Sequence, residues 1–251
     1  MSQSSADVLI ERYDSIIRIQ FNRPRKKNAL KAEMYHAVRE TLEAADADPT
    51  VCVVYITGSG DSFTAGNDLN SFLQTPGSDA AARFITQISK TETPLVAAVN
   101  GLAVGVGVTM LLHCDLVYAA DQARFNFAFI DLGVVPEAAA SYLLPRMVGQ
   151  RRAAELLMLG ERFDAQTAQS IGLVNRVTPS EELEAFAWQK AQQLASKPPE
   201  ALRQTKMLLK RGTADAVAET IPVELGIFAE RMRSTEAQAI MQALLQRKRS
   251  K

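Results

Sequence analysis

The sequence contains little cysteine and histidine, and this shortage excludes two classes of protein. The two cysteines among its 251 residues, Cys52 and Cys114, stand in apolar surroundings, which is typical of buried reduced thiols rather than of a disulfide framework. The two histidines, His36 and His113, do not combine with them in the paired spacing of a zinc site. We therefore expect neither a disulfide nor a metal.

An excess of charge of one sign and long apolar runs are also missing. Lys+Arg and Asp+Glu number 28 each, so the total charge gives no reason to expect binding to nucleic acid or to an anionic membrane. No apolar run reaches the ~18 residues of a membrane-spanning helix, and MSQSSADV lacks the regions of a signal peptide. We expect a soluble, cytoplasmic protein with one large domain or a core and a helical appendage.

Apolar strands alternate with amphipathic helices along the chain. The runs 8–11 and 16–21 predict a hairpin, and a helix over 30–47 and buried strands over 51–57 and 95–99 follow. Strand, helix and strand in this order indicate an α/β fold with a parallel sheet. Residues 71–79 are expected to form a flexible connector. Helices are predicted over 80–90, 151–159, 165–170, 181–195, 200–210, 214–232 and 235–249.

Two of the predicted strands end in loops of small residues. Gly58–Leu69 reads GSGDSFTAGNDL, and Gly101–Gly107 precedes the start of a helix. Neither loop has the spacing of a phosphate-binding or dinucleotide-binding motif, so neither predicts a nucleotide cofactor. Ligands of open α/β sheets bind at such strand ends, and free N–H groups at a helix start suit a partial negative charge. A tight turn in which glycine only permits close packing explains the same pattern.

Six segments of the chain resemble the crotonase family, also called the enoyl-CoA hydratase/isomerase family, in order and spacing. They are 22–30 (NRPRKKNAL), 58–69, 94–107, 114–125, 132–149 and 172–177. The resemblance implies the crotonase (ClpP/crotonase-like) fold, a spiral of ββα repeats. Residues 1–195 would form the core, and residues 196–251 a C-terminal helical region that joins subunits into a homotrimer or hexamer. It also implies an acyl-CoA thioester as substrate and no separate cofactor, with no nucleic acid or membrane as partner.

The resemblance also implies an oxyanion hole made by two backbone N–H groups, those of Asn67 and Val106. Such donors stabilise the negative charge that develops on the thioester oxygen when C2 loses its proton. Ala65 and Gly66, which precede Asn67, are expected to contact coenzyme A.

A basic loop near the N-terminus is the expected contact of the coenzyme A phosphates. Its cations are Arg25, Lys26 and Lys27, and the family uses this loop near the nucleotide. A solvated loop explains the same charges.

The acidic residues favour isomerisation over hydration. The family's hydratases carry two glutamates, at the positions where this chain has Thr109 and Phe129. Addition of water needs a base and an acid, and phenylalanine supplies neither. Glu137, after Pro136, instead matches the acid of the Δ3,Δ2-enoyl-CoA isomerase branch, where one base moves a proton from C2 to C4 through a dienolate. A carboxylate at a helix N-terminus explains Glu137 without catalysis.

Several polar residues near the predicted site have alternative roles. Asp131 is a candidate second acid or a member of a structural ion pair, and Asp68 is expected to cap or brace its loop. Thr109 is expected either to orient a water molecule or to pack, and His113 to be structural. We further expect Phe127, Phe129, Val134 and Val135 to keep the surroundings of Glu137 dry, which favours a more basic carboxylate.

Other functions stay open at this stage. They are hydration by a different set of acids, isomerisation of a ring-containing acyl-CoA and, without catalysis, recognition of RNA or of a protein partner. An apolar stripe with Ile240, Leu244 and Leu245 has helical spacing. It is expected to bury either in the core of this chain or against a neighbouring subunit.

Overall fold

The fold is built around a large, mainly parallel sheet. The computed structural model describes residues 7–74 and 79–249, apart from the side chains of 72–74 and 247–249. Within these residues the sheet has six strands in the order β1-β2-β3-β5-β7-β10, and only the β1–β2 pair is antiparallel. The strands are β1 Val8–Tyr13, β2 Ile16–Phe21, β3 Val53–Gly58, β5 Leu95–Val99, β7 Leu116–Ala120 and β10 Arg176–Thr178. The predicted hairpin and parallel sheet are confirmed.

A second, smaller sheet takes its strands from the same stretches of chain. In the described part of the chain its order is β4-β6-β8-β9, with β8 and β9 antiparallel. Its strands are β4 Ser62–Thr64, β6 Leu102–Val104, β8 Arg124–Asn126 and β9 Phe163–Asp164. The pairs β3/β4, β5/β6 and β7/β8 each give one strand to each sheet, so the chain winds in a spiral. We did not predict this sheet, because strands of two or three residues are too short to show a period of two.

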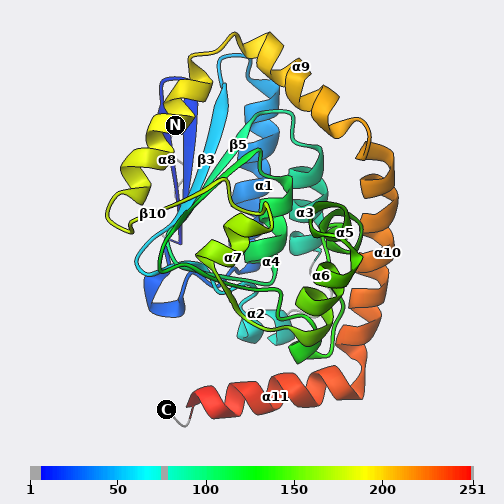
Figure 1. Ribbon diagram of the computed structural model, residues 1–251. Helices are drawn as coiled ribbons and strands as arrows, with labels where there is room; N and C mark the ends of the chain where they lie inside the picture. Colours follow the sequence, from blue (N-terminus) through cyan, green and yellow to red (C-terminus); the bar gives the residue numbers. More distant parts are fainter. Residues whose placement is uncertain (1–6, 75–78, 250–251) are drawn as a thin grey trace.

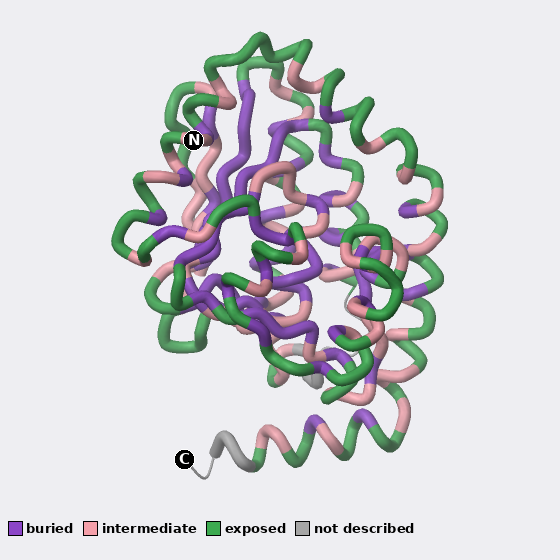
Figure 2. Tube along the Cα trace, viewed as in Figure 1, coloured by how far each residue is buried: buried purple, intermediate pink, exposed green. Residues whose placement is uncertain are grey.

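Helices cover both faces of the large sheet (Figure 1). On one face lie α1 Ala32–Ala47 and α3 Ala80–Lys90, and on the other lies α8 Leu183–Ala195. Successive side chains of β3 point to opposite faces of the sheet. Val54 and Ile56 pack in the core beneath α1 and α3, and Val53 and Tyr55 pack toward α8. Figure 2 shows these strands as the buried centre of the molecule.

Most of the remaining helices lie close to predicted positions. The remaining helices are α2 Leu69–Gln74, α4 Val106–Thr109, α5 Ala140–Val148, α6 Gln150–Ala154, α7 Ala165–Ser170, α9 Pro199–Lys210, α10 Ala214–Arg233 and α11 Thr235–Arg249. Of these, α2 and α5 fall where no helix range was predicted. A 3-10 turn, Met110–His113, continues α4, and a π-helical turn, Glu155–Leu159, continues α6. The expected connector 71–79 needs correction, because residues 71–74 are helical and belong to α2. Residues 75–78 lie outside the described residues.

The C-terminal helices return to the core. Helix α10 packs against α3 and α5, and α11 contacts α2 and the 3-10 turn Ile130–Leu132. In Figure 1 α9 and α10 run down one side of the molecule, and α11 crosses below it. In the described residues no helix is long and apolar enough to cross a membrane.

Candidate active site

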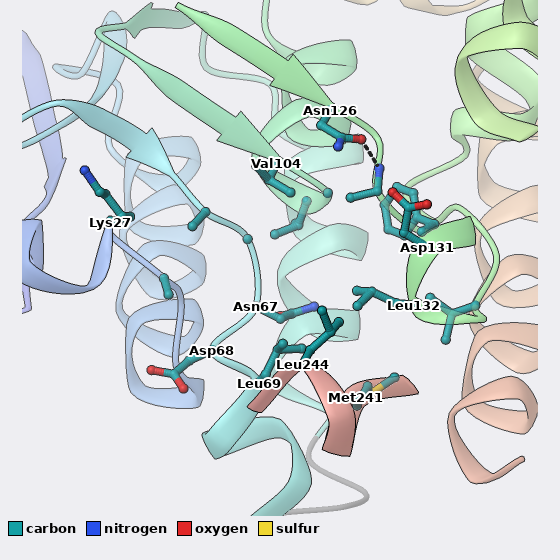
Figure 3. A pocket seen from close by; sticks show the side chains of 18 of the residues that line it. Lys27, Asn67, Asp68, Leu69, Val104, Asn126, Asp131, Leu132, Met241 and Leu244 are labelled. Atoms are coloured by element: carbon teal, nitrogen blue, oxygen red, sulfur yellow. Dashed lines mark hydrogen bonds between the residues drawn. The ribbon is translucent and has the colours of Figure 1, made fainter. Parts of the chain in front are cut away.

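A cavity of about 970 Å³ opens where the two small-residue loops meet (Figure 3). Figure 3 shows Lys27 and Asp131 on opposite sides of this cavity, with Asn67 between them. Its wall is formed by loops at strand ends of both sheets and by residues of helices α10 and α11. The lining includes Arg25, Lys26, Lys27, Ala29, Ala65, Gly66, Asn67, Asp68, Leu69, Val104, Gly105, Val106, Asn126, Phe129, Asp131, Leu132, Val134, Arg162, Phe228, Met232, Met241, Leu244 and Leu245.

Glycine lets the two loops approach each other closely. Gly66 has φ +80°, and a Cβ on it would lie 2.7 Å from the carbonyl oxygen of Val104. A Cβ on Gly107 would lie 2.6 Å from Cγ2 of Thr64. No larger side chain fits either position without a shift of the backbone. Close packing, one of the two explanations of the glycine pattern, is therefore present, and it brings the loops to one cavity.

Two backbone N–H groups at this cavity have no hydrogen-bond partner among the described residues. Asn67 forms an isolated parallel bridge with Leu30 whose hydrogen bonds use Gly66 O and Asp68 N. Val106 is the first residue of α4, where the N–H has no acceptor within the helix. Among the hydrogen bonds of the described residues, none uses the N–H of Asn67 or Val106. Both residues line the cavity, so both donors are available to a ligand.

Glu137 lies behind the wall of the cavity rather than on it. Its side chain is buried, with 4% exposed, and the residues that line the cavity include Val134 and Val106 but not Glu137. The hydroxyl of Thr109, one turn beyond Val106, donates to its Oε1 atom. Its Oε2 atom has no hydrogen-bond partner within the described residues. Such an atom is costly to bury, and it is free to accept a proton.

Glu137 precedes the N-terminus of α5, but its side chain forms no capping hydrogen bond there. Helix α5 begins after Ala139, and no side chain at that N-cap position bonds to it. The N–H groups of Ala139 and Ser141 instead donate to Glu224, on α10. Glu137 is thus not a cap of α5, and its burial needs another reason.

Burial raises the pKa of Glu137 to about 8. The negative charge of Glu224 raises this pKa further, whereas the hydrogen bond from Thr109 lowers it. Phe127, Phe129 and Val134 are buried beside the site, as expected, and Val135 is half-buried. A carboxylate with a raised pKa is a stronger base.

The family resemblance assigns Thr109 and Phe129 to the positions of the two hydratase acids. Thr109 is fully buried and bonded to Glu137, so its role is to hold that carboxyl rather than to orient a water molecule. Phe129 is 6% exposed and forms part of the cavity wall. An aromatic ring thus stands where a second acid is needed for hydration.

Asp131 lines the cavity and is exposed. The ion pair that would make it structural is not seen, since Asp131 forms no salt bridge with any described residue. Its carboxylate can therefore contact a ligand in the cavity, and Asp131 remains a candidate second acid.

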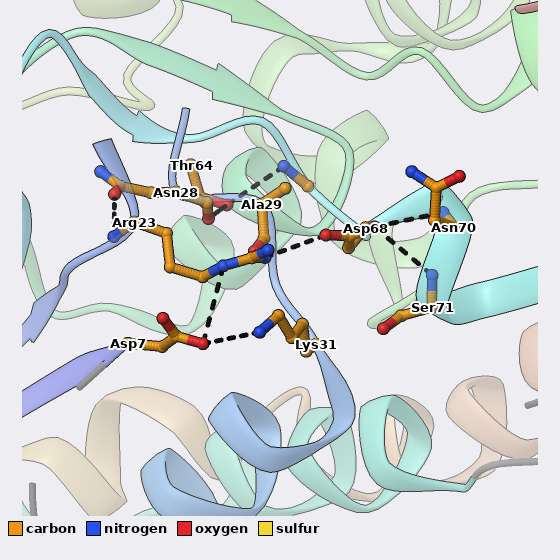
Figure 4. Close-up of polar contacts among 10 residues, drawn as sticks. Asp7, Arg23, Asn28, Ala29, Lys31, Thr64, Asp68, Asn70 and Ser71 are labelled. Atoms are coloured by element: carbon orange, nitrogen blue, oxygen red, sulfur yellow. Dashed lines mark hydrogen bonds and ion pairs between the residues drawn. The ribbon is translucent and has the colours of Figure 1, made fainter. Parts of the chain in front are cut away.

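Arg23 and Asp68 join the basic loop to the loop that carries Asn67 (Figure 4). Nη1 of Arg23 lies 3.0 Å from Oδ2 of Asp68, and the side chains are 10% and 13% exposed. Oδ1 of Asp68 also accepts from the N–H of Asn70 at 3.1 Å, at the start of α2. Asp68 therefore braces its loop, as expected. The role of Arg23 was missed, because the sequence shows it only as one more cation of the basic loop.

The other three cations of this loop stay exposed at the cavity. Arg25, Lys26 and Lys27 belong to its lining. Lys27 forms an ion pair with Asp61, and within the described residues Arg25 and Lys26 form none. Two full positive charges are thus available at this end of the cavity.

Tyr35, on α1, is a site residue that sequence reasoning missed. Its hydroxyl donates to Oδ1 of Asn67 at 2.6 Å. Burial raises its pKa well above the ordinary value, and the charge of nearby Glu137 adds to this shift. The sequence offers no signal for this contact beyond a tyrosine on the buried face of a helix.

His113 is structural, as expected. Its ring Nε2 donates to the carbonyl oxygen of Ala138 at 2.8 Å, and burial lowers its pKa to about 4.

Cys52 and Cys114 are free thiols. The described residues contain no group of three or more His, Cys, Asp or Glu side chains that could hold a metal ion.

The apolar stripe of α11 packs against this chain. Leu244 and Leu245 line the cavity with Met241, and Ile240 lies beside Gly133. Figure 3 shows Leu244 and Met241 on the wall that α11 supplies. The stripe closes the cavity, and burial against a neighbouring subunit is not needed to explain it.

The chain is similar in sequence and structure to known proteins of one family. The sequence profile of the family described as enoyl-CoA hydratase/isomerase matches residues 11–251. Enoyl-CoA delta isomerase 2 of Rattus norvegicus is 36% identical over 98% of this chain, which spans 65% of that relative's length. The 2,3-dehydroadipyl-CoA hydratase of Escherichia coli (strain K12) is 32% identical over 97% of each chain. The crystal structure of an enoyl-CoA hydratase/isomerase from Pseudoalteromonas atlantica T6c is 41% identical, with a TM-score of 0.92 over 96% of this chain and 97% of that one.

Proposed function

This chain belongs to the enoyl-CoA hydratase/isomerase family, and on that premise we propose that it is an isomerase that moves the double bond of a 3-enoyl-CoA to the 2-position. The observation that carries the proposal is the buried carboxyl of Glu137, which has one oxygen without a hydrogen-bond partner among the described residues, while Phe129 fills the place of a second acid. Isomerisation needs one group that takes a proton and returns it. The similarity to a delta isomerase agrees with this chemistry.

The proposed reaction uses the two free N–H groups and Glu137. The thioester oxygen accepts from the N–H of Asn67 and Val106, so the charge that forms on it is stabilised by fixed donors. The Glu137 carboxylate takes a proton from C2, and the electron pair of the C–H bond passes into the carbonyl to give a dienolate. The resulting Glu137 carboxylic acid then donates that proton to C4. The double bond now lies between C2 and C3, and no water is consumed.

The two ends of the cavity suit the two ends of an acyl-CoA. Arg25 and Lys26 offer positive charge to the coenzyme A phosphates, and Gly66, without a side chain, leaves room beside the thioester. The apolar residues of α10 and α11 suit the acyl chain. Because coenzyme A is part of the substrate, the proposal requires no separate cofactor.

Hydration is a second candidate, and Asp131 is the observation that favours it. This carboxylate is exposed in the cavity without an ion pair among the described residues. Together with Glu137 it would supply the base and the acid that water addition needs. One relative is named as a hydratase.

An assay with two substrates separates these candidates. The purified protein is incubated with 3-enoyl-CoA and, separately, with 2-enoyl-CoA, and the conjugated thioester is followed by its absorbance. We expect the 3-enoyl substrate to gain conjugation and the 2-enoyl substrate to keep it. Rapid loss of conjugation from the 2-enoyl substrate would instead establish hydration and bring Asp131 into the mechanism.

We also propose that the protein self-associates through α9 and α10. Five large apolar side chains are exposed on these helices, Met207, Leu208, Leu209, Val223 and Ile227, and Leu209 is 80% exposed. Apolar surface of this extent is typical of an interface, and the family resemblance implies a trimer or hexamer.

The mass in solution tests this proposal. Light scattering coupled to size exclusion is expected to give a multiple of the 27.4 kDa chain, and Leu209→Glu to lower that mass because a charge would be buried. The control Gln192→Glu, at an exposed position of α8, should leave the mass unchanged. A monomeric wild-type protein would contradict the proposal.

A further inference from the structure

Glu224, a buried carboxylate on α10, has no part in the reaction proposed above. Its side chain is 5% exposed. Oε2 accepts from the N–H of Ala139 at 2.6 Å, and Oε1 accepts from the N–H and the hydroxyl of Ser141 at 2.9 and 2.5 Å. Glu224 therefore binds, from 85 residues away in sequence, the backbone that directly follows Glu137.

The segment that Glu224 holds is a strained turn. Ala138 and Ala139 have φ +61° and +56°, a left-handed conformation that is unfavourable for a residue with a Cβ and that persists only where surrounding contacts enforce it. Both alanines are buried. The contacts that hold the turn include the two N–H bonds to Glu224, the bond from His113 to Ala138 O and the backbone bond from Ala140 N to Glu137 O.

The turn decides where the Glu137 carboxyl lies. Thr109 fixes one oxygen of this carboxyl, but the Cα atom that carries the side chain is placed by the backbone of 138 and 139. Without Glu224 the buried N–H group of Ala139 and the partly buried N–H group of Ser141 would lose their acceptor, and the turn would relax toward ordinary φ values. The carboxyl would then leave the position from which it serves the cavity.

The negative charge of Glu224 also acts on Glu137, whose pKa it raises. The titratable groups around Glu137 are Tyr35 from α1, His113 from the 3-10 turn after α4 and Glu224 from α10. Burial keeps Tyr35 and His113 neutral near pH 7. Burial raises the pKa of Glu224 too, but the three donors on it oppose this shift and favour the carboxylate.

We infer that Glu224 is a positioning residue for the base Glu137: it holds the left-handed turn at 138 and 139, and its negative charge keeps that base strong. The inference rests on the proposed function for the role of Glu137, and it adds a distant residue to the same site.

The test compares Glu224→Gln and Glu224→Ala with the wild-type protein in the 3-enoyl-CoA assay. Glu224→Ala is expected to lower kcat about 100-fold, with KM nearly unchanged, because displacement of a catalytic group by ~1 Å costs that much. Glu224→Gln keeps an acceptor for Ser141 and is expected to lower kcat about tenfold. Glu230→Gln makes the same change at an exposed position of α10, and it should leave kcat as it is.

The pH profile separates positioning from a merely structural role. The reaction needs ionised Glu137, so wild-type kcat should fall as the pH drops through about 8. Loss of the negative charge in Glu224→Gln lowers the pKa of Glu137, and the midpoint should move to lower pH by at least about half a unit. A loss of kcat that is equal at all pH values, with the wild-type midpoint, would overturn the inference.

A second readout does not depend on catalysis. Glutamate labelled with ¹³C at the side-chain carboxyl allows Glu137 to be titrated by NMR, with Glu137→Gln identifying its signal. We expect a lower midpoint in Glu224→Gln than in the wild type. If the wild type does not isomerise but this shift occurs, the proposed function fails and the influence of Glu224 on Glu137 stands. An unchanged midpoint overturns the inference, and if Glu224→Ala does not fold, Glu224→Gln decides.

Discussion

Glu137→Gln is expected to lower the rate of isomerisation by about 10³-fold or more while the protein stays folded. The amide has the size of the carboxyl and can still accept from Thr109, but it cannot take a proton from C2. Loss of a general base typically costs ~10²–10⁴-fold in rate. Single-turnover measurements with 3-enoyl-CoA check the rate.

Thermal unfolding of the same variant gives an independent check of the buried carboxyl. The folded-state pKa of Glu137 is raised from 4.5 to about 8 by burial, so its contribution to stability is present below pH 4.5 and is lost as the pH rises through 8. Glutamine does not ionise. Glu137→Gln should therefore gain stability relative to the wild type over that pH window, whereas Glu219→Gln, exposed on α10, should not. A variant with nearly wild-type activity would sink the assignment of the base.

Gly66→Ala is expected to lower kcat/KM by about 10²–10³-fold, the loss that follows removal of one oxyanion donor. The new methyl group would lie 2.7 Å from the carbonyl oxygen of Val104. The methyl group would be attached rigidly to the backbone of residue 66, and the oxygen that it meets also belongs to the backbone. One of the two loops must therefore move, and the N–H of Asn67 moves with residue 66. Steady-state kinetics with 3-enoyl-CoA measure the effect.

Gly172→Ala is a matched control for this prediction. Gly172 has the same φ, +80°, but the nearest atom to its added Cβ is Cγ of Met147 at 3.9 Å. This variant therefore carries the strain of the left-handed conformation without the collision, and it should lose stability but keep kcat/KM. Equal losses of kcat/KM in both variants would mean that strain, rather than displacement of the donor, is responsible.

The sequence predicts the helices and strands that are long enough to show a hydrophobic periodicity. The hairpin, the parallel strands and most helices are confirmed, and so are the family resemblance and the crotonase fold that it implies. The small sheet was missed because its strands are two or three residues long. Its pairing depends on contacts between β4, β6 and β8, which are far apart in sequence.

The sequence likewise predicts some features of the candidate site and not others. Asn67, Val106, Asp131 and the basic loop were expected at one site, and the structure brings all of them to one cavity. Their roles in catalysis stay predictions. Contacts between distant side chains could not be read from the sequence.

Three such contacts define the surroundings of Glu137 and of the loop that carries Asn67. Thr109 binds Glu137, Tyr35 binds Asn67, and Arg23 binds Asp68. Each joins elements whose separation in the chain hides their proximity. A lone tyrosine or arginine carries no sign of its partner.

The cavity wall that α11 supplies gives this protein room for evolutionary change. Met241, Leu244 and Leu245 shape the cavity, yet none of them belongs to the loops that carry Asn67 and Val106 or to the turn after Glu137. Under the proposed function, mutations in α11 would alter which acyl groups fit, while the donors and the base lie in other segments of the chain. Natural selection can act on substrate range and on catalytic rate as two separate traits, encoded in two separate stretches of the gene.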